Sequence, residues 1–340
     1  MKKSVLLLLL LTTIPLLAAR REGSRFDEIP RDDPSSALFT RAQRVIPFAD
    51  GSRFVVTLAP TATDPKAITG ALVMSDRTIH HFTGASLLPE GFLAPGLLGQ
   101  INSAARLSTT ELAISLGYLR PGKGAGGAIV LVTLRDGRWT TSRVIDMPTG
   151  VRDLAGGPGG TILAVTADVV RMKRDGAAPL VTILDSAGRV AGEWFDVAIA
   201  NPAAAARNAH RARLQRLGNG SLALFDDASA SVRTFDVVAE KDRYTATVRR
   251  TIAVGVLPPE AKSAPLILIK GVHVDAAGAV HVVRSFAGGD VWSAETIYGH
   301  DGSVVHRGSP FEYRAAYWID DALNAVIATP DALMIERAAK

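Results

Sequence analysis

The sequence predicts an all-β protein, and two observations predict this class. The first is the local pattern: apolar and polar residues alternate in short segments separated by turns rich in Gly and Asp, while stretches with helical periodicity are scarce. Residues 271–283, GVHVDAAGAVHVV, show the unit, in which two alternating strands flank the turn Asp-Ala-Ala-Gly. The second observation is that this hairpin unit recurs along the chain.

The recurrence predicts the architecture. Related hairpins occupy residues 44–58, 105–116, 151–166, 213–225 and 317–328. One turn position per unit gives Gly51, Thr110, Gly160, Gly220, Gly278 and Leu323, which are separated by 59, 50, 60, 58 and 45 residues. Six units of four-strand length at this spacing predict a six-bladed β-propeller, in which neighbouring blades bury each other's faces.

A second hairpin follows the first in five units, with turns near Asp76, Gly137, Gly188, Lys241 and Gly302. The sixth unit lacks it, because only 17 residues follow Leu323. A blade without its outer strand would leave an unpaired edge, which proteins avoid. We therefore expect an N-terminal strand around residues 37–43 to complete the last blade and close the ring.

The chain divides into a signal peptide at residues 1–19, a linker at 20–36 and the propeller at 37–340. Lys2 and Lys3, an apolar run from Val5, and the small residues Ala18 and Ala19 have the layout of a secretory signal. We expect a periplasmic or secreted protein without stable membrane insertion, because the apolar run is shorter than the roughly 20 residues of a spanning helix. The stretch 201–217 is the one segment expected to be helical, since it combines Pro202 with a run of alanines.

Composition excludes several classes of function. The chain has no Cys, so disulfides, thiolate metal sites and thiol nucleophiles are excluded. Loss of Lys2 and Lys3 with the signal peptide lowers the formal net charge from +5 to +3, and no dense basic tract favours nucleic-acid binding. We expect a monomer with no cofactor and no nucleic-acid partner.

Two segments resemble a known family. NGSLALFDDASASVRTFDV (219–237) is similar to the NHL repeat, and VHVDAAGAVHVV (272–283) is similar to its opening hairpin. The chain thus resembles six-bladed propellers of the NHL-repeat and gluconolactonase-like superfamily. This resemblance implies a sugar-lactone hydrolase, a lyase or a binding module, and the gluconolactonase-like enzymes hold a divalent cation through Glu, Asn and Asp. The sequence pattern does not assign two of the five Asn residues to inner strands, so no metal ligands are assigned.

Catalytic motifs are missing from the sequence. No G-x-S-x-G segment offers a serine nucleophile, and no HExxH spacing offers a zinc site. His273 and His281 flank one turn, and an even-length loop would point them to opposite faces of the sheet. We therefore assign no metal ligand and no catalytic residue.

One pattern of charge remains. A basic residue lies just before or within the expected innermost strand of every unit: Arg44, Arg106, Arg152, Arg213, Lys270 and Arg314. Equivalent positions on sixfold-related blades converge on the central channel, and guanidinium groups bind carboxylate, phosphate and sulfate well. The leading hypothesis is an exported binding module for an unknown protein or a small anionic ligand, with an anion site at the channel mouth. The alternative is a metal-assisted hydrolase or lyase of the gluconolactonase-like kind.

Overall fold

The computed structural model describes only part of the chain. The described residues are 25–29, 38, 42–57, 69–89, 92, 98–120, 124–147, 149–198, 212–227, 229–241, 243–257, 266–287, 291–307, 311–312, 316–319, 325–328 and 333–337. The predicted signal peptide and Arg314 lie outside them. No helix in the described part of the chain is long and apolar enough to cross a membrane.

Within the described residues the strands form six antiparallel sheets, five of which are built from consecutive strands. The first contains β2 (Ala42–Pro47), β3 (Arg53–Thr57), β4 (Thr69–Val73) and β5 (Ile79–Thr83). The second contains β6 (Leu98–Ser108), β7 (Glu111–Arg120), β8 (Gly124–Arg135) and β9 (Arg138–Met147). The third contains β10 (Gly150–Gly156), β11 (Ile162–Ala167), β12 (Ala177–Leu184) and β13 (Val190–Ala198).

The fourth sheet contains β14 (Arg213–Arg216), β15 (Leu222–Asp226), β16 (Ser231–Glu240) and β17 (Arg243–Ala253). The fifth contains β18 (Leu266–Val274), β19 (Val280–Ala287), β20 (Val291–Tyr298), β21 (Val304–Arg307) and the short β22 (Phe311–Glu312). The sixth joins both ends of the chain in the order β1 (Arg25–Ile29), β25 (Leu333–Arg337), β24 (Ala325–Ala328) and β23 (Ala316–Ile319).

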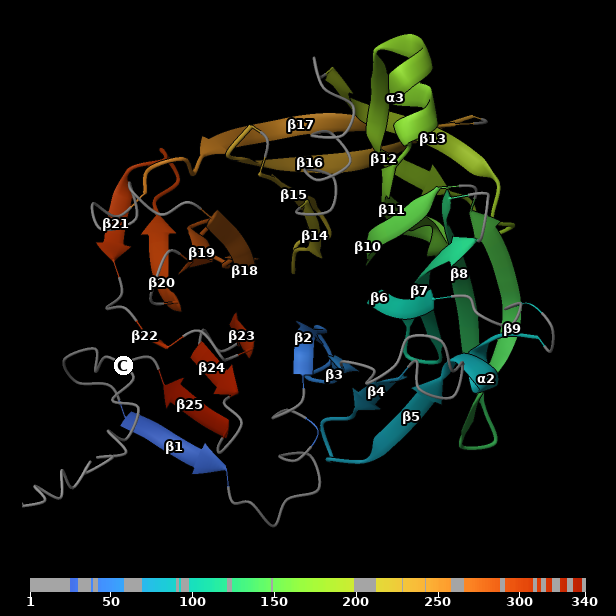
Figure 1. The fold of residues 1–340 in the computed structure, drawn as a ribbon, viewed down its shortest axis with the longest axis horizontal. Coiled ribbons are helices and arrows are strands. Elements are labelled where there is room, and N and C mark those ends of the chain that lie inside the picture. Colours follow the sequence, from blue (N-terminus) through green and yellow to red (C-terminus); the bar gives the residue numbers. More distant parts are fainter. Residues whose placement is uncertain are drawn as a thin grey trace, which may run out of the picture.

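The sheets are arranged as a β-propeller. The first strands contact one another in sequence, from β6 to β10, β14, β18, β23 and β2, and β6 also contacts β3 and β4 of the first sheet. Figure 1 shows these first strands around the centre of the molecule and the last strands of the sheets at its periphery. This radial arrangement confirms the predicted all-β propeller fold.

The core consists of layers between consecutive sheets. Both faces of the second strands are buried, as in β15 and in the middle of β3, because each sheet packs against a neighbour on either side. In β11, for example, Leu163 and Val165 pack toward Leu214 and Phe235 of the fourth sheet, while Ile162 packs toward the second. Burial on both faces explains why β11 and β15 are nearly continuous apolar runs.

The hairpin turns share one geometry. In the turn from Asp275 to Ala279, the Gly278 N–H donates to the Asp275 carbonyl oxygen at 2.9 Å, and the Asp275 N–H donates to the Ala279 carbonyl oxygen at 3.0 Å. Gly278 has a φ of 80°, in the left-handed region that glycine adopts without steric cost. The same pair of bonds occurs in the turns that begin at Phe48, Met74, Asp185, Leu217 and Gly299.

This turn geometry corrects the predicted orientation of His273 and His281. The extra glycine makes the loop odd in length, so Val274 pairs with Val280 and His273 pairs directly with His281. The two imidazoles therefore lie on the same face, with ring centroids 6.0 Å apart. The prediction of opposite faces assumed a turn without a bulge and is wrong.

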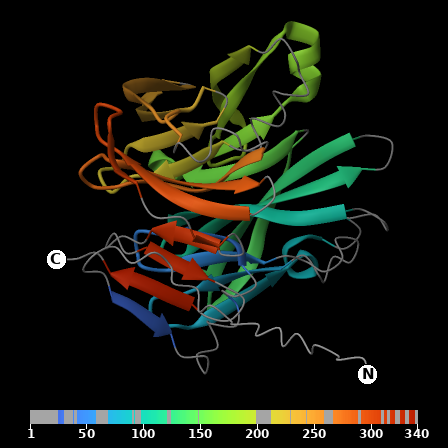
Figure 2. The same cartoon turned by 60° about the vertical axis from the view of Figure 1, so that its left-hand side comes forward.

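The N-terminal strand also differs from the prediction. Strand β1, inside the segment predicted to be a linker, pairs with β25 from Arg25 opposite Arg337 to Ile29 opposite Leu333. Figures 1 and 2 both show β1 (blue) beside the C-terminal strands (red). The segment 37–43 does not supply this strand, because Ala42 and Gln43 begin β2, whose pairing with β3 starts at Ala42.

The helix predicted at 201–217 is wrong at its C-terminal end, where residues 213–216 form β14. Pairing of β14 with β15 overrides local helix propensity there. Residues 201–211 lie outside the described part of the chain. The described helices are the short α2 (Gly84–Leu87) and α3 (Val169–Asp175), which the sequence did not indicate.

Candidate functional site

A β-bulge recurs in the first strands of four described sheets. The residue without a cross-strand partner is Gln43 in β2, Asn102 in β6, Arg152 in β10 and Lys270 in β18. Bulges redirect the side chains beside them. The residues that follow these bulge positions are Arg44, Ser103, Asp153 and Gly271. In β14 the corresponding residue is Arg213, which lies four residues before its turn, as Arg44, Asp153 and Gly271 do. These bulges define equivalent inner positions around the propeller.

The carboxylate of Asp153 joins strands of four sheets. Its Oδ2 accepts hydrogen bonds from Arg44 Nη2 at 2.9 Å and from the Leu214 N–H at 2.9 Å. Its Oδ1 accepts from Ser103 Oγ at 2.5 Å and from the Leu154 N–H at 2.9 Å. A side chain that reaches the first, second and fourth sheets from the third lies where the inner strands converge. Asp153 is fully buried there.

The charges around Asp153 set the protonation of the cluster. Burial raises the pKa of the Asp153 carboxyl, but the positive charges of Arg44 and Arg213 and the hydrogen bonds from Arg44 and Ser103 outweigh it and hold the pKa below 3.8. Burial and the like charge of Arg44 lower the pKa of Arg213 to about 10, against the attraction of Asp153. Two guanidinium groups thus face one carboxylate, so the cluster keeps a net positive charge at neutral pH.

Arg152 is a further basic residue on an inner strand, β10. It occupies the bulge position next to Asp153, and an added Cβ at Gly150 would lie 3.7 Å from its Cζ. Burial alone lowers the pKa of Arg152, and its Nε is buried without a hydrogen-bond partner. No carboxylate of the described residues pairs with Arg152. The structure therefore brings Arg44 and Arg213 together at Asp153, while Arg152 is the residue before Asp153 in β10.

Of the other predicted basic residues, only Arg106 has a described side chain, and it lies away from this cluster. Arg106 lies three residues beyond Ser103, where its Nη2 is 3.2 Å from Asp50 Oδ2 and its guanidinium is 5.2 Å from the centre of the Trp139 ring. Lys270 holds the bulge position in β18, but its side chain is not among the described ones. Arg314 lies wholly outside the described residues.

Asn102 belongs to the site although the sequence pattern did not place it on an inner strand. Its Nδ2 donates to the Val151 carbonyl oxygen at 2.7 Å, and its Oδ1 accepts from Gln100 Nε2 at 2.7 Å. Gly117 makes room for it, because an added Cβ at Gly117 would lie 2.6 Å from Asn102 Nδ2. Asn102 thereby links the second and third sheets beside the charged cluster.

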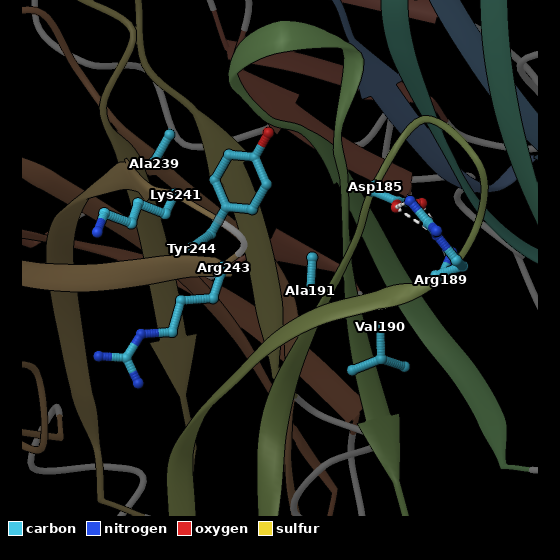
Figure 3. Close-up of a pocket in the computed structure, with 8 residues that line it drawn as sticks. All are labelled: Asp185, Arg189, Val190, Ala191, Ala239, Lys241, Arg243 and Tyr244. Atoms are coloured by element: carbon cyan, nitrogen blue, oxygen red, sulfur yellow. Dashed lines mark hydrogen bonds and ion pairs between the residues drawn. The ribbon is translucent and has the colours of Figure 1, made fainter.

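A groove of about 540 Å³ lies at the rim between the third and fourth sheets. Figure 3 shows Lys241 and Arg243 on one side of it, the ion pair of Asp185 and Arg189 on the other, and the ring of Tyr244 between them. Asp185 accepts from Arg189 Nε at 2.9 Å, and Glu240 accepts from Arg243 Nε at 3.2 Å. Most charges of the groove are paired and exposed. The groove is therefore a weaker candidate for a binding site than the central cluster, which consists of Asp153, Arg44 and Arg213.

A second buried polar cluster lies in the fifth sheet. His281 Nδ1 is 2.9 Å from Glu295 Oε1, and its Nε2 is 3.3 Å from Asp275 Oδ2. Gln215 of the fourth sheet reaches across, with Nε2 at 3.2 Å from His273 Nδ1. Within the described residues, however, no group of three or more His, Asp and Glu side chains is arranged to hold a metal ion.

Comparison with known proteins supports the fold. No family model and no curated protein matches the sequence. Among solved structures, the chain is similar to a periplasmic gluconolactonase from Pseudomonas aeruginosa, with 14% identity, a TM-score of 0.51, and coverage of 88% of this chain and 82% of that one. It also matches a glucose dehydrogenase with 13% identity and a TM-score of 0.48, over 93% of this chain and 100% of that one. A third match is the WD40 β-propeller domain of Doa1, with 12% identity and a TM-score of 0.40, over 93% of this chain and 96% of that one. The likeness to the gluconolactonase supports the class of the β-propeller, and at 14% identity it shows the fold alone.

Proposed function

We propose that this protein is an exported β-propeller that binds a small anionic ligand at the mouth of its central channel and does not catalyse a reaction. The observation that carries the proposal is Arg152, a half-buried guanidinium on an inner strand with no carboxylate partner among the described residues. A positive charge taken from water without a partner costs free energy. A bound carboxylate, phosphate or sulfate would offset this cost through paired hydrogen bonds.

Arg44 and Arg213 extend the positive field. Both guanidinium groups interact with the single carboxylate of Asp153, so together they add positive charge near the position of Arg152 in the chain. The lowered pKa of Arg213 supports this reading, because it reflects a guanidinium whose charged form is disfavoured by burial and by Arg44. An anion placed near the three groups would reduce both penalties.

The alternative function is a metal-assisted hydrolase or lyase of the gluconolactonase-like kind. Its support is the fold likeness to the periplasmic gluconolactonase. The described residues favour binding instead, because every lone pair of Asp153 is already taken by a donor and two cations stand beside it. Those surroundings suit an anion better than a divalent cation.

The propeller is proposed to have six blades, with the sheet of β1 and β23–β25 as the last. The pairing of β1 with β25 and the contacts of β23 with both β18 and β2 support this arrangement. Strand β1 would then hold the ends of the chain together and close the ring.

Export is proposed from the layout of residues 1–19. Sequencing the mature protein from its native host should give an N-terminus at Ala19 or Arg20. A mature protein that begins at Met1 would contradict export.

Thermal melting at low ionic strength tests the anion site. Citrate, phosphate and sulfate should raise the melting temperature of the unmutated protein above that in chloride of equal ionic strength, because a ligand of the folded state stabilises it by mass action. Arg152→Ala should lose this increase. Arg138→Ala, which removes an exposed charge from β9, should keep it. No anion-dependent increase in the unmutated protein would refute the proposal.

A further inference from the structure

The guanidinium of Arg44 stands among oxygen atoms that could serve a metal ion. Its Nη2 is 2.9 Å from both Oδ1 and Oδ2 of Asp153, and its Nη1 is 3.3 Å from the carbonyl oxygen of Asn102. Carboxylate and carbonyl oxygens are the ligands that hard divalent cations prefer. In this protein the carboxylate of Asp153 and the carbonyl oxygen of Asn102 surround the guanidinium of Arg44.

The remaining contacts of Asp153 leave no place for a second cation. An ionised carboxylate offers about four lone-pair sites. Arg44 Nη2, Ser103 Oγ and the main-chain N–H groups of Leu154 and Leu214 donate to them. A divalent cation would have to displace Arg44 and would then face the buried charge of Arg213. The residues therefore do not fit the cation that the gluconolactonase-like resemblance implies.

We infer that the Arg44 guanidinium is a built-in cation of the channel, standing where a divalent ion would otherwise neutralise Asp153. The fold then requires no divalent metal at its centre. The ligand site requires none either, a part of the inference that rests on the proposed anion binding. Because Arg44 is covalently attached, the positive charge stays in place at any metal concentration.

The first test uses the unmutated protein. Its melting temperature should be the same in EDTA and in millimolar Mg²⁺, Ca²⁺, Mn²⁺ or Zn²⁺, and sulfate should raise it equally in EDTA and in Mg²⁺. A melting temperature that falls in EDTA and recovers with one of the ions would overturn the inference. An absent sulfate effect with an unchanged metal result would instead refute the proposed function and leave the built-in cation standing.

Variants of the pair test the site itself. Arg44→Met should lower the melting temperature in EDTA and gain a stabilising response to divalent cations, since it leaves the Asp153 carboxylate and the Asn102 carbonyl oxygen without their cation. The double variant Arg44→Met/Asp153→Asn should lose that response, because the carboxylate is gone. A folded Arg44→Met protein whose melting temperature does not rise with divalent cations would contradict the inference that Arg44 stands in the place of such a cation. Should Arg44→Met not fold, the metal titration of the unmutated protein decides.

Discussion

Arg44 and Asp153 lie 109 positions apart in the sequence, yet Arg44 Nη2 donates to Asp153 Oδ2 at 2.9 Å. The two residues belong to the first and third sheets, so their ion pair reaches past the second sheet at the centre of the propeller. Asp153 is buried and the Arg44 side chain is 19% exposed, which places the pair largely away from water. Removal of either partner leaves an uncompensated charge.

Asp153→Asn should lower the free energy of unfolding at pH 7 by about 3–5 kcal/mol, because it leaves Arg44 and Arg213 without their carboxylate. The effect should depend on pH. A carboxyl whose folded pKa lies below 3.8 stabilises the fold above 3.8, and the contribution is lost as the pH falls through the folded pKa. Urea unfolding at pH 7, 5, 4 and 3 should show the difference between the two proteins shrinking below pH 3.8. A difference that stays constant would contradict this role of Asp153.

Phe235→Ala should cost about 3–5 kcal/mol of unfolding free energy, the usual range for a large buried aromatic side chain. Phe235 is fully buried between the third and fourth sheets, with its ring centroid 5.1 Å from that of Phe195 and 6.3 Å from that of Trp194. Val238→Ala on the same strand is the control, because Val238 is 44% exposed. Chemical denaturation measures the free energy of unfolding of both variants. Equal losses of unfolding free energy in Phe235→Ala and Val238→Ala would contradict the packing of Phe235 between these sheets.

Gly220→Ala tests the turn geometry. Gly220 has a φ of 86°, and an added Cβ would meet no atom within 4 Å, so the cost is that of the backbone conformation, about 1–2 kcal/mol. Gly218→Ala is the matched control, since Gly218 lies in the same turn with equal space and without a positive φ. Denaturation midpoints should fall for Gly220→Ala and change little for Gly218→Ala. A larger fall for Gly218→Ala would show that the turn is assigned wrongly.

Deletion of residues 20–33 tests the ring closure. This truncation removes β1 and leaves the edge of β25 unpaired, so the melting temperature should fall well below that of the mature protein. A shorter deletion of residues 20–23, which ends before β1, should change the melting temperature little. Equal melting temperatures for the two truncated proteins would contradict closure by β1.

Much of the fold follows from local sequence. Alternation and turn glycines such as Gly51, Gly220 and Gly278 indicate the hairpins, because glycine alone adopts their backbone angles without strain. The orientation of His273 and His281 was missed because one bulge residue reverses the register, and alternation alone does not reveal a bulge. A strand from the N-terminal part was expected to pair with the last unit, but at residues 37–43 instead of β1, because local sequence does not determine which N-terminal residues pair with a strand at the other end of the chain.

The central cluster was predictable only in part. Basic residues near inner strands indicated Arg44, Arg152 and Arg213. Asp153 was not singled out because aspartate more often marks turns, and its role depends on Ser103 and Arg44, which lie 50 and 109 positions away. The signal that could have found it is its spacing, because Asp153 lies four residues before the start of its turn, as Arg44 and Arg213 do.

The sharpest test of the anion site is calorimetric titration of citrate at low ionic strength into the unmutated protein, Arg152→Ala and Arg138→Ala. We expect saturable binding to the unmutated protein and to Arg138→Ala, and at least about tenfold weaker binding to Arg152→Ala, a loss of about 1.4 kcal/mol that matches a charge-assisted hydrogen bond. Added salt should weaken binding to the unmutated protein. Equal affinities for all three proteins, or no binding to any of them, would contradict an anion site at Arg152.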